Sequence, residues 1–230
     1  MTLAPTVSEV AGALSPDGLI LRGGFNFTPD DAPPAGPSGA PARSVLLVGQ
    51  AGAAPWPHFQ RWLEKQPKPI ANPLDTWSRQ TIGAMAQAFG GRAVSPSDRP
   101  FMPFQQWAMR AEGLKPSPLG ILMHPRYGLW HAYRGALLFE VEIAFDEPHE
   151  VIHLCDACVD KPCLKSCPVG AYTEHGFTHQ ACLDHVRGAD GGPCRTVGCL
   201  DRNACPYGAD YRYPQAAQAF HMASYASLTR

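Results

Sequence analysis

The first 154 residues of this 230-residue chain lack cysteine entirely, and all eight cysteines lie between Cys155 and Cys205. The chain also lacks a basic surplus, because 19 Lys and Arg stand against 20 Asp and Glu. Nucleic-acid-binding domains usually carry such a surplus, so we expect no nucleic-acid partner. No apolar run approaches the roughly eighteen residues of a membrane span, and no secretory leader follows Met1. We therefore expect a cytoplasmic protein with no membrane partner, in which the thiols stay reduced.

The 24 prolines and 22 glycines predict many turns between short elements. An apolar run predicts a buried strand at 44–48, and alternating residues predict strands at 119–123 and 135–143. Apolar periodicity predicts helices at 56–66, 75–89 with Asp75 as its N-cap, 104–111 and 214–228. This order of elements is typical of an α+β fold. A boundary near 147/148 would separate a first domain, 1–147, from a metal-organised domain, 148–230, that ends in a helix.

The cysteines form two groups, and each group ends in Cys-Pro. Eight thiolates are the number that two 4Fe–4S clusters require, with four ligands each. Short spacings also let one loop wrap around a cluster. The metal ligands that we predict are therefore Cys155, Cys158, Cys163 and Cys167, followed by Cys182, Cys194, Cys199 and Cys205.

This arrangement resembles the bacterial two-cluster ferredoxin motif, C-x2-C-x2-C-x3-C-P, with longer gaps at four places. In such ferredoxins the fourth cysteine of each run binds the other cluster. The resemblance thus implies one cluster on Cys155, Cys158, Cys163 and Cys205, and a second on Cys167, Cys182, Cys194 and Cys199. A structural zinc site is the alternative, but only Cys155-x2-Cys158 has its usual spacing. One cluster with spare cysteines is a further alternative.

The cysteine-free part ends in an unusual segment, ILMHPRYGLWHAYRGALL, at 121–138. We interpret it as a strand, a tight loop and a second strand, with a cluster of polar and aromatic side chains near the loop. Such side chains could present hydrogen-bond donors and flat faces to a large planar ligand. The alternative is a connection whose aromatic rings simply pack. The candidate cofactor-binding residues are His124, Tyr127, Trp130, His131 and Arg134.

The segment HPRYGLWHAYRGALL is similar to the HPRFGGWFAIRG-type segment of the CblC family of cobalamin-processing proteins. This resemblance implies a nitroreductase-like α+β fold for the first domain and a bound corrinoid, cobalamin. The thiol-binding arginines of that family cannot be placed on this chain. Epoxyqueuosine reductases and reductive dehalogenases also resemble it, because they join a corrin-binding domain to a C-terminal two-cluster module. The isolated cysteine of Gln180-Ala181-Cys182-Leu183 is a shared feature, whereas the catalytic segment of epoxyqueuosine reductase is not found.

These observations together predict an iron–sulfur oxidoreductase that passes single electrons to a cobalamin and reduces or decyanates it. The cofactors would be two 4Fe–4S clusters and cobalamin, and no catalytic residue is assigned. The expected partners are an electron donor, such as a flavoprotein or ferredoxin reductase, and a protein that uses or carries cobalamin. Two alternatives stay open: a dedicated ferredoxin-type electron-transfer protein without a corrinoid, and a flavin-dependent reductase. The sole hint of a flavin phosphate loop is Gly49-Gln50-Ala51-Gly52, which is a weak signal.

Overall fold

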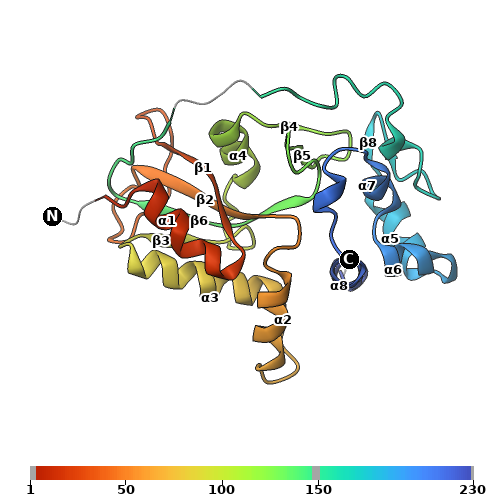
Figure 1. Cartoon of the computed structure of the whole chain (residues 1–230), viewed down its shortest axis with the longest axis horizontal. Helices are drawn as coiled ribbons and strands as arrows, with labels where there is room; N and C mark the ends of the chain where they lie inside the picture. The colour runs from red at the N-terminus through yellow and green to blue at the C-terminus, as the bar shows by residue number, and fades with distance from the viewer. Residues whose placement is uncertain (1–3, 147–150, 229–230) are drawn as a thin grey trace. The chain divides into compact units, whose positions relative to one another are not determined.

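The computed structural model describes residues 4–146 and 151–228, and the chain divides into two compact units (Figure 1). The first unit contains the chain up to Gly113 and resumes at Ala132. The second contains Leu114–His131 and the chain from Val151 onward. The boundary predicted at 147/148 lies outside the described residues. Residues 114–131, which we expected in the first domain, share a compact unit with the cysteines.

A four-stranded sheet forms the centre of the first unit, in the order β1-β2-β6-β3. Strand β2 lies inside the sheet, and its residues from Ser44 to Gln50 are all buried. A strand covered on both faces needs a continuous apolar run, which is why SVLLV was recognisable in the sequence. The strand bounds are Ile20–Asn26 for β1, Ser44–Ala51 for β2, Arg92–Val94 for β3 and His131–Phe139 for β6.

Four helices belong to the first unit, and α1 contacts both β1 and α3. Helix α1 is fixed by a capping box, in which the amide of Glu9 donates to Thr6 Oγ1 and Thr6 N donates to the Glu9 carboxylate. Helix α3 begins at Pro73, so the prediction of Asp75 as its N-cap is wrong. Proline is favoured at the first helical position, and Asp75 lies in the first turn instead. The helices are α1 (Val7–Leu14), α2 (Trp56–Glu64), α3 (Pro73–Ala88) and α4 (Phe104–Glu112).

Strand β6 begins and ends four residues earlier than the predicted 135–143, so His131 and Arg134 lie on a strand. Gly135, the predicted start, is an internal strand position. A Cβ built on Gly135 would lie 2.8 Å from Ile82 Cδ1 of α3, so glycine permits a close approach of helix and strand. The predicted strand at 119–123 is also shorter, because only Leu122–Met123 (β5) is extended.

A buried ion pair joins β1 to α4. Arg22 is 1% exposed, and its Nε donates to Glu112 Oε1 at 2.8 Å while a second guanidinium nitrogen donates to Oε2 at 3.0 Å. The Tyr133 hydroxyl also donates to Glu112. Burial raises the pKa of Tyr133. The three side chains therefore satisfy each other inside the unit.

The second unit consists of short elements, and its cysteines are distributed over several of them. Among the described residues, no helix has the length and apolar character needed to cross a bilayer. The last helix, α8, lies within the predicted 214–228. The elements are β4 (Lys115–Pro116), β5, β7 (Tyr172–Thr173), β8 (Gly176–Phe177), α5 (His179–Arg187), α6 (Gly192–Val197), α7 (Leu200–Ala204) and α8 (Gln215–Ala226), with 3-10 turns η2 (Pro162–Leu164), η3 (Ala189–Gly191) and η4 (Ala209–Tyr211).

Candidate metal centre and ligand loop

Four cysteines from both sequence groups line one cavity in the second unit. The cavity has an empty volume of about 310 Å³, and its other walls come from 117–118, 123, 129, 161–162 and 206–207. Three of its cysteines belong to the first group and the fourth comes from the end of the second. This is the first of the two ligand sets that the ferredoxin resemblance implies. The four lining cysteines are Cys155, Cys158, Cys163 and Cys205.

Local turns present these thiols to the cavity. The amide of Cys158 donates to the carbonyl of Cys155 at 3.3 Å, so the x2 spacing closes a turn. Cys163 is the central residue of η2, and Cys205 follows the last residue of α7. Helix α7 packs against η2, which brings the end of the second group beside the first.

The four thiols of this set interact electrostatically. Burial is the largest cause that raises the pKa of Cys155 to about 11, and the charges of Cys205, Cys163 and Cys158 add to it. Burial, Cys205 and Cys158 likewise raise the pKa of Cys163. Four thiolates in one buried place repel each other, so the set favours a bound cation that offsets their charge.

The remaining four cysteines, Cys167, Cys182, Cys194 and Cys199, influence one another in the same way. Burial raises the pKa of Cys194, and the charges of Cys167 and Cys182 raise it further. Burial raises the pKa of Cys199 to about 11, with a smaller contribution from Cys182. Cys167 Sγ accepts a hydrogen bond from the amide of Ala171 at 3.4 Å.

The donor sets suit iron–sulfur clusters better than single ions. All eight cysteines are free thiols. Among the described residues, no three or more His, Cys, Asp or Glu side chains are arranged to hold one metal ion. In a cubane each thiolate binds a different iron, so four thiols around an open cavity fit a cluster.

Asp201 is fully buried, with 0% exposure, and its charge acts on cysteines of both sets. Its Oδ1 accepts the amide of Ser166 at 3.0 Å, which ties α7 to the segment between two ligands of the first group. Burial raises the pKa of Asp201, and the amides of Ser166 and Cys167 oppose that rise. Its charge raises the pKa of Cys163 in one set and of Cys194 in the other. Asp201 was not predicted from the sequence, although its place inside the gap between Cys199 and Cys205 was a signal.

The predicted ligand loop is a tight turn. The amides of His124 and Gly128 each donate to the carbonyl of the other, at 3.0 and 2.9 Å. His124 Nδ1 accepts the amides of Arg126 and Tyr127 at 3.0 and 3.1 Å, so this nitrogen carries no proton. The rings of His124 and Tyr127 stack with centroids 4.0 Å apart. His131 Nε2 donates to the carbonyl of Leu122 at 2.8 Å, because a carbonyl can only accept.

Two glycines allow this turn to pack closely against the chain that follows Cys205. Gly128 has a φ of +56°, and a Cβ there would lie 2.1 Å from the carbonyl oxygen of Tyr207. Gly208 has a φ of +70°, and its Cβ would lie 2.3 Å from the carbonyl of Tyr127. Positive φ and this contact both require glycine. The Arg126 guanidinium also donates to the Tyr211 hydroxyl at 2.7 Å.

Trp130 is packed inside the second unit instead of lying open in a loop. Its side chain is 0% exposed, and the Arg202 guanidinium carbon lies 4.4 Å from its ring centroid. The ring of Tyr213 meets it edge-on at 5.4 Å. Arg202 also donates to the carbonyl of Leu129 at 2.6 Å. Trp130 Nε1 and Arg202 Nε are buried without a hydrogen-bond partner among the described residues.

The structure therefore divides the five predicted cofactor-binding residues. His124, Tyr127, Trp130 and His131 belong to the second unit, whereas Arg134 belongs to the first. Within its own unit, Arg134 Nε donates to Gln50 Oε1 at 2.7 Å. Arg202 was not predicted, and no local sequence pattern distinguishes it from other arginines.

Neither a protein-family model nor a curated protein matches this chain. Among solved structures, a C. elegans B12-trafficking protein, CblC, has a TM-score of 0.56 and 14% identity, over 96% of this chain and 92% of that chain. This likeness confirms the predicted α+β fold of CblC type and concerns the fold alone. Epoxyqueuosine reductases from Streptococcus thermophilus (TM-score 0.49, 16% identity) and Bacillus subtilis (0.46, 15%) align over 75% and 76% of this chain. The chain spans about half of their length, 51% in both cases.

Proposed function

We propose that this chain is an iron–sulfur redox protein that passes single electrons through two 4Fe–4S clusters to a corrinoid and reduces it. The two cysteine sets would hold the clusters. The corrinoid would be cobalamin, and it would be the substrate that receives the electrons. Of the five residues predicted to contact it, His124 and Tyr127 are the ones proposed to do so. Trp130 and His131 are buried in the second unit and would support the loop from inside, and Arg134 belongs to the first unit.

The observation that carries the proposal is that the CblC-like loop and the first cysteine set share one core. Met123 and Leu129, at the two ends of the loop, are 2% and 0% exposed and pack in one cluster with Cys155, Cys163 and Cys205. The segment that resembles a corrin-binding loop is thus built onto the proposed electron source. Such packing gives a short covalent and non-covalent path between them.

The protein's own groups have distinct tasks in this scheme. When bound, the clusters supply and accept single electrons. The cysteines fix their position, and Met123 and Leu129 keep water away from one side of the first cavity. Low exposure to water is one of the factors that set a cluster's potential. The hydrogen bond from the Ala171 amide to Cys167 Sγ is another.

The electron count is simple. One electron from a reduced cluster converts Co(III) to Co(II), and the cluster returns to its oxidised state. The upper axial ligand of the corrinoid, such as cyanide, then leaves with its own electron pair. A flavoprotein or ferredoxin reductase would supply the next electron to the cluster, so a turnover needs no other oxidant or reductant.

An anaerobic titration tests the proposal. Protein purified without oxygen should be brown and contain about eight irons per chain, the number in two cubane clusters. After reduction with dithionite and removal of the excess, hydroxocobalamin should lose its Co(III) absorbance and give the EPR signal of Co(II). We expect about one Co(II) for each electron that the reduced protein holds. Cyanocobalamin should release free cyanide in the same assay.

The controls separate the alternatives. A protein that holds iron but neither retains nor reduces cobalamin would be a dedicated electron-transfer protein, and the corrinoid part would be refuted. A yellow protein that retains FMN would be a flavin-dependent reductase. A colourless protein that contains zinc would refute the cluster assignment itself. The metal analysis and the cobalamin assay are independent, because the first measures iron and zinc in the protein and the second follows the cobalt of the corrinoid.

A further inference from the structure

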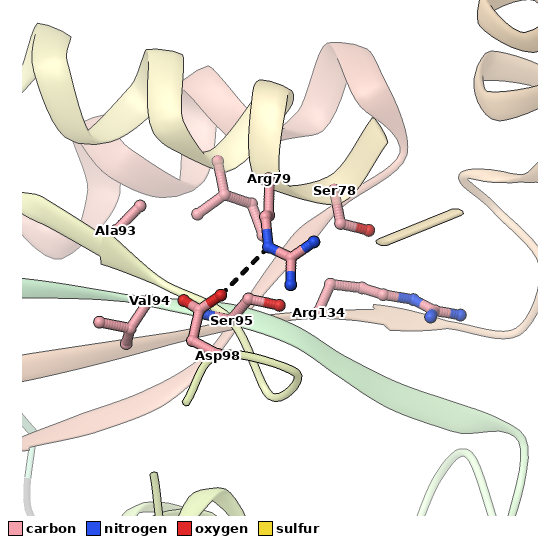
Figure 2. Close-up of a pocket in the computed structure, with 8 residues that line it drawn as sticks. Ser78, Arg79, Ala93, Val94, Ser95, Asp98 and Arg134 are labelled. Carbon is pink, nitrogen blue, oxygen red and sulfur yellow. Dashed lines mark hydrogen bonds and ion pairs between the residues drawn. The ribbon is translucent and has the colours of Figure 1, made fainter. Parts of the chain in front are cut away.

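A second cavity lies in the first unit, between α3 and the strands β3 and β6 (Figure 2). Its volume is about 140 Å³, which is room for a small ligand. In Figure 2, Arg79 extends from α3 toward Asp98, while Arg134 and Ser95 lie on the strand side. Apart from Arg134, none of its lining residues was predicted to contact a cofactor. The cavity is lined by Ser78, Arg79, Ile82, Ala93, Val94, Ser95, Asp98 and Arg134.

One of its two guanidinium groups is held by a fixed amide. Gln50 is 4% exposed, and its Nε2 donates to the carbonyl of Gly52 at 2.7 Å. Its Oε1 must therefore accept, and it receives Arg134 Nε at 2.7 Å. The direction of the Gln50 amide thus orients the Arg134 side chain. An arginine positioned in advance loses less entropy when it binds an anion.

The other guanidinium is held by the turn after β3. Arg79 Nε donates to Asp98 Oδ1 at 3.1 Å, and a terminal nitrogen donates to Ser97 Oγ at 2.7 Å. Asp98 Oδ2 in turn accepts the amide of Ser95 at 2.7 Å, which fixes the carboxylate. Two guanidinium groups and one carboxylate therefore line the cavity. The rest of its wall includes Ile82, Ala93 and Val94.

We propose that this cavity binds a small monocarboxylate, with its carboxylate near Arg79 and Arg134 and its aliphatic part against the apolar wall. Of the charged side chains that line the cavity, two are cationic and one is anionic, so a monoanion suits it better than a dianion. Paired guanidinium forks match the planar geometry of a carboxylate. The apolar residues favour a short hydrocarbon chain over a bare inorganic ion.

Calorimetric titration of the full, cluster-loaded chain tests this site with three probes: butyrate, its neutral analogue butyramide, and inorganic phosphate. Butyrate should bind, butyramide should bind at least about tenfold more weakly, and phosphate should bind more weakly than butyrate. Arg79→Gln should weaken butyrate binding about tenfold, as expected for one lost charge-assisted hydrogen bond. The matched control is Arg43→Gln, which removes the same charge from an exposed ion pair and should change the affinity less than twofold.

A gain in affinity provides a test that misfolding cannot imitate. Asp98→Asn removes the one carboxylate of the cavity and should tighten butyrate binding a few fold. The proposal is overturned if butyrate does not bind, or if Arg79→Gln and Arg43→Gln have equal effects. Phosphate binding as tight as that of butyrate would overturn the monocarboxylate assignment. Because the readout is carboxylate binding, a failed cobalamin assay leaves this test unaffected.

Discussion

The crossed assignment of cysteines can be tested with two double variants that differ at a single position. In Cys163→Ala/Cys205→Ala both changes fall in the set around the first cavity. In Cys163→Ala/Cys167→Ala the changes fall in different sets, although the two cysteines are neighbours in sequence. A consecutive assignment, with one cluster per sequence group, reverses this distribution. The two schemes therefore make opposite predictions.

The structure gives the expected magnitudes. Cys163 and Cys205 line the same cavity, and Cys205 is the largest charge contribution that raises the pKa of Cys163. Cys167 is not among the residues that line it. The first double variant should therefore keep about four irons of eight, and the second should keep almost none. Alanine is preferred to serine because it offers no substitute oxygen ligand.

Iron and acid-labile sulfide per chain, measured on anaerobically purified protein, are the assay. The reasoning is refuted if Cys163→Ala/Cys205→Ala loses all iron while Cys163→Ala/Cys167→Ala keeps half. Both variants could lose all iron if each cluster were needed to fold the shared loops. The single variants Cys163→Ser and Cys205→Ser then decide, because a serine oxygen that retains the cluster changes its EPR signal. Under the crossed scheme these two variants change the same signal.

Three further predictions concern charges whose surroundings differ. Glu112→Ala removes the carboxylate partner of the buried Arg22 and should lower the free energy of unfolding by about 3 kcal/mol in urea. Arg43→Ala, at an exposed ion pair, should lower it by less than about 1 kcal/mol. Equal losses would contradict the burial argument. Asp201→Asn should keep about eight irons and raise the cluster midpoint potentials by roughly 50 mV, because a nearby negative charge favours the oxidised state. Redox titration followed by EPR measures these potentials, and unchanged values would contradict the argument. The hydrogen bond from Arg110 lowers the pKa of Asp31 to about 2 from 3.8, so its stabilising effect is complete above pH 3.8 and is lost as the pH falls to about 2. Arg110→Gln should reduce that dependence, which is below about 1 kcal/mol at this exposed site, while the hydrogen bonds from Thr28 keep part of it. Urea unfolding compared at pH 2 and 5 measures the change.

Local sequence patterns predicted the helices and strands that are determined mainly by their own residues. The run at 44–48 was recognisable because β2 is covered on both sides and needs apolar side chains throughout. Helix α4 followed from its apolar spacing and differs by one residue at its end. The start of β6 was placed at Gly135 and not at His131, whereas Gly135 is an internal position where the strand packs closely against Ile82. That contact joins positions more than fifty residues apart, so no local pattern reveals it.

The cysteine pattern identified candidate ligands, but the groups that surround them required the structure. Asp201 and Arg202 lie in the gap of five residues before Cys205. From the sequence alone, this gap is recognisable only as a longer loop. In the structure one is a buried carboxylate whose charge acts on both sets, and the other covers the ring of Trp130. A charged residue in a short gap carries no sequence signal of burial. The residues that such a side chain contacts depend on the path of the chain around the thiols.

The position of the CblC-like loop changes the argument for function. In the sequence, this segment ended the first domain and lay about twenty residues before the first cysteine. In the structure its first part, 124–131, belongs to the cysteine unit, whereas the chain from Ala132 belongs to the first unit. Gly128 and Gly208 allow close packing of this first part against the chain that follows Cys205. The first part of the CblC-like segment and the cysteines therefore share one folded unit. The four thiols of the first set favour a bound cation that offsets their charge. Under the proposed function, a corrinoid at this loop would therefore contact the same unit that holds this cysteine set.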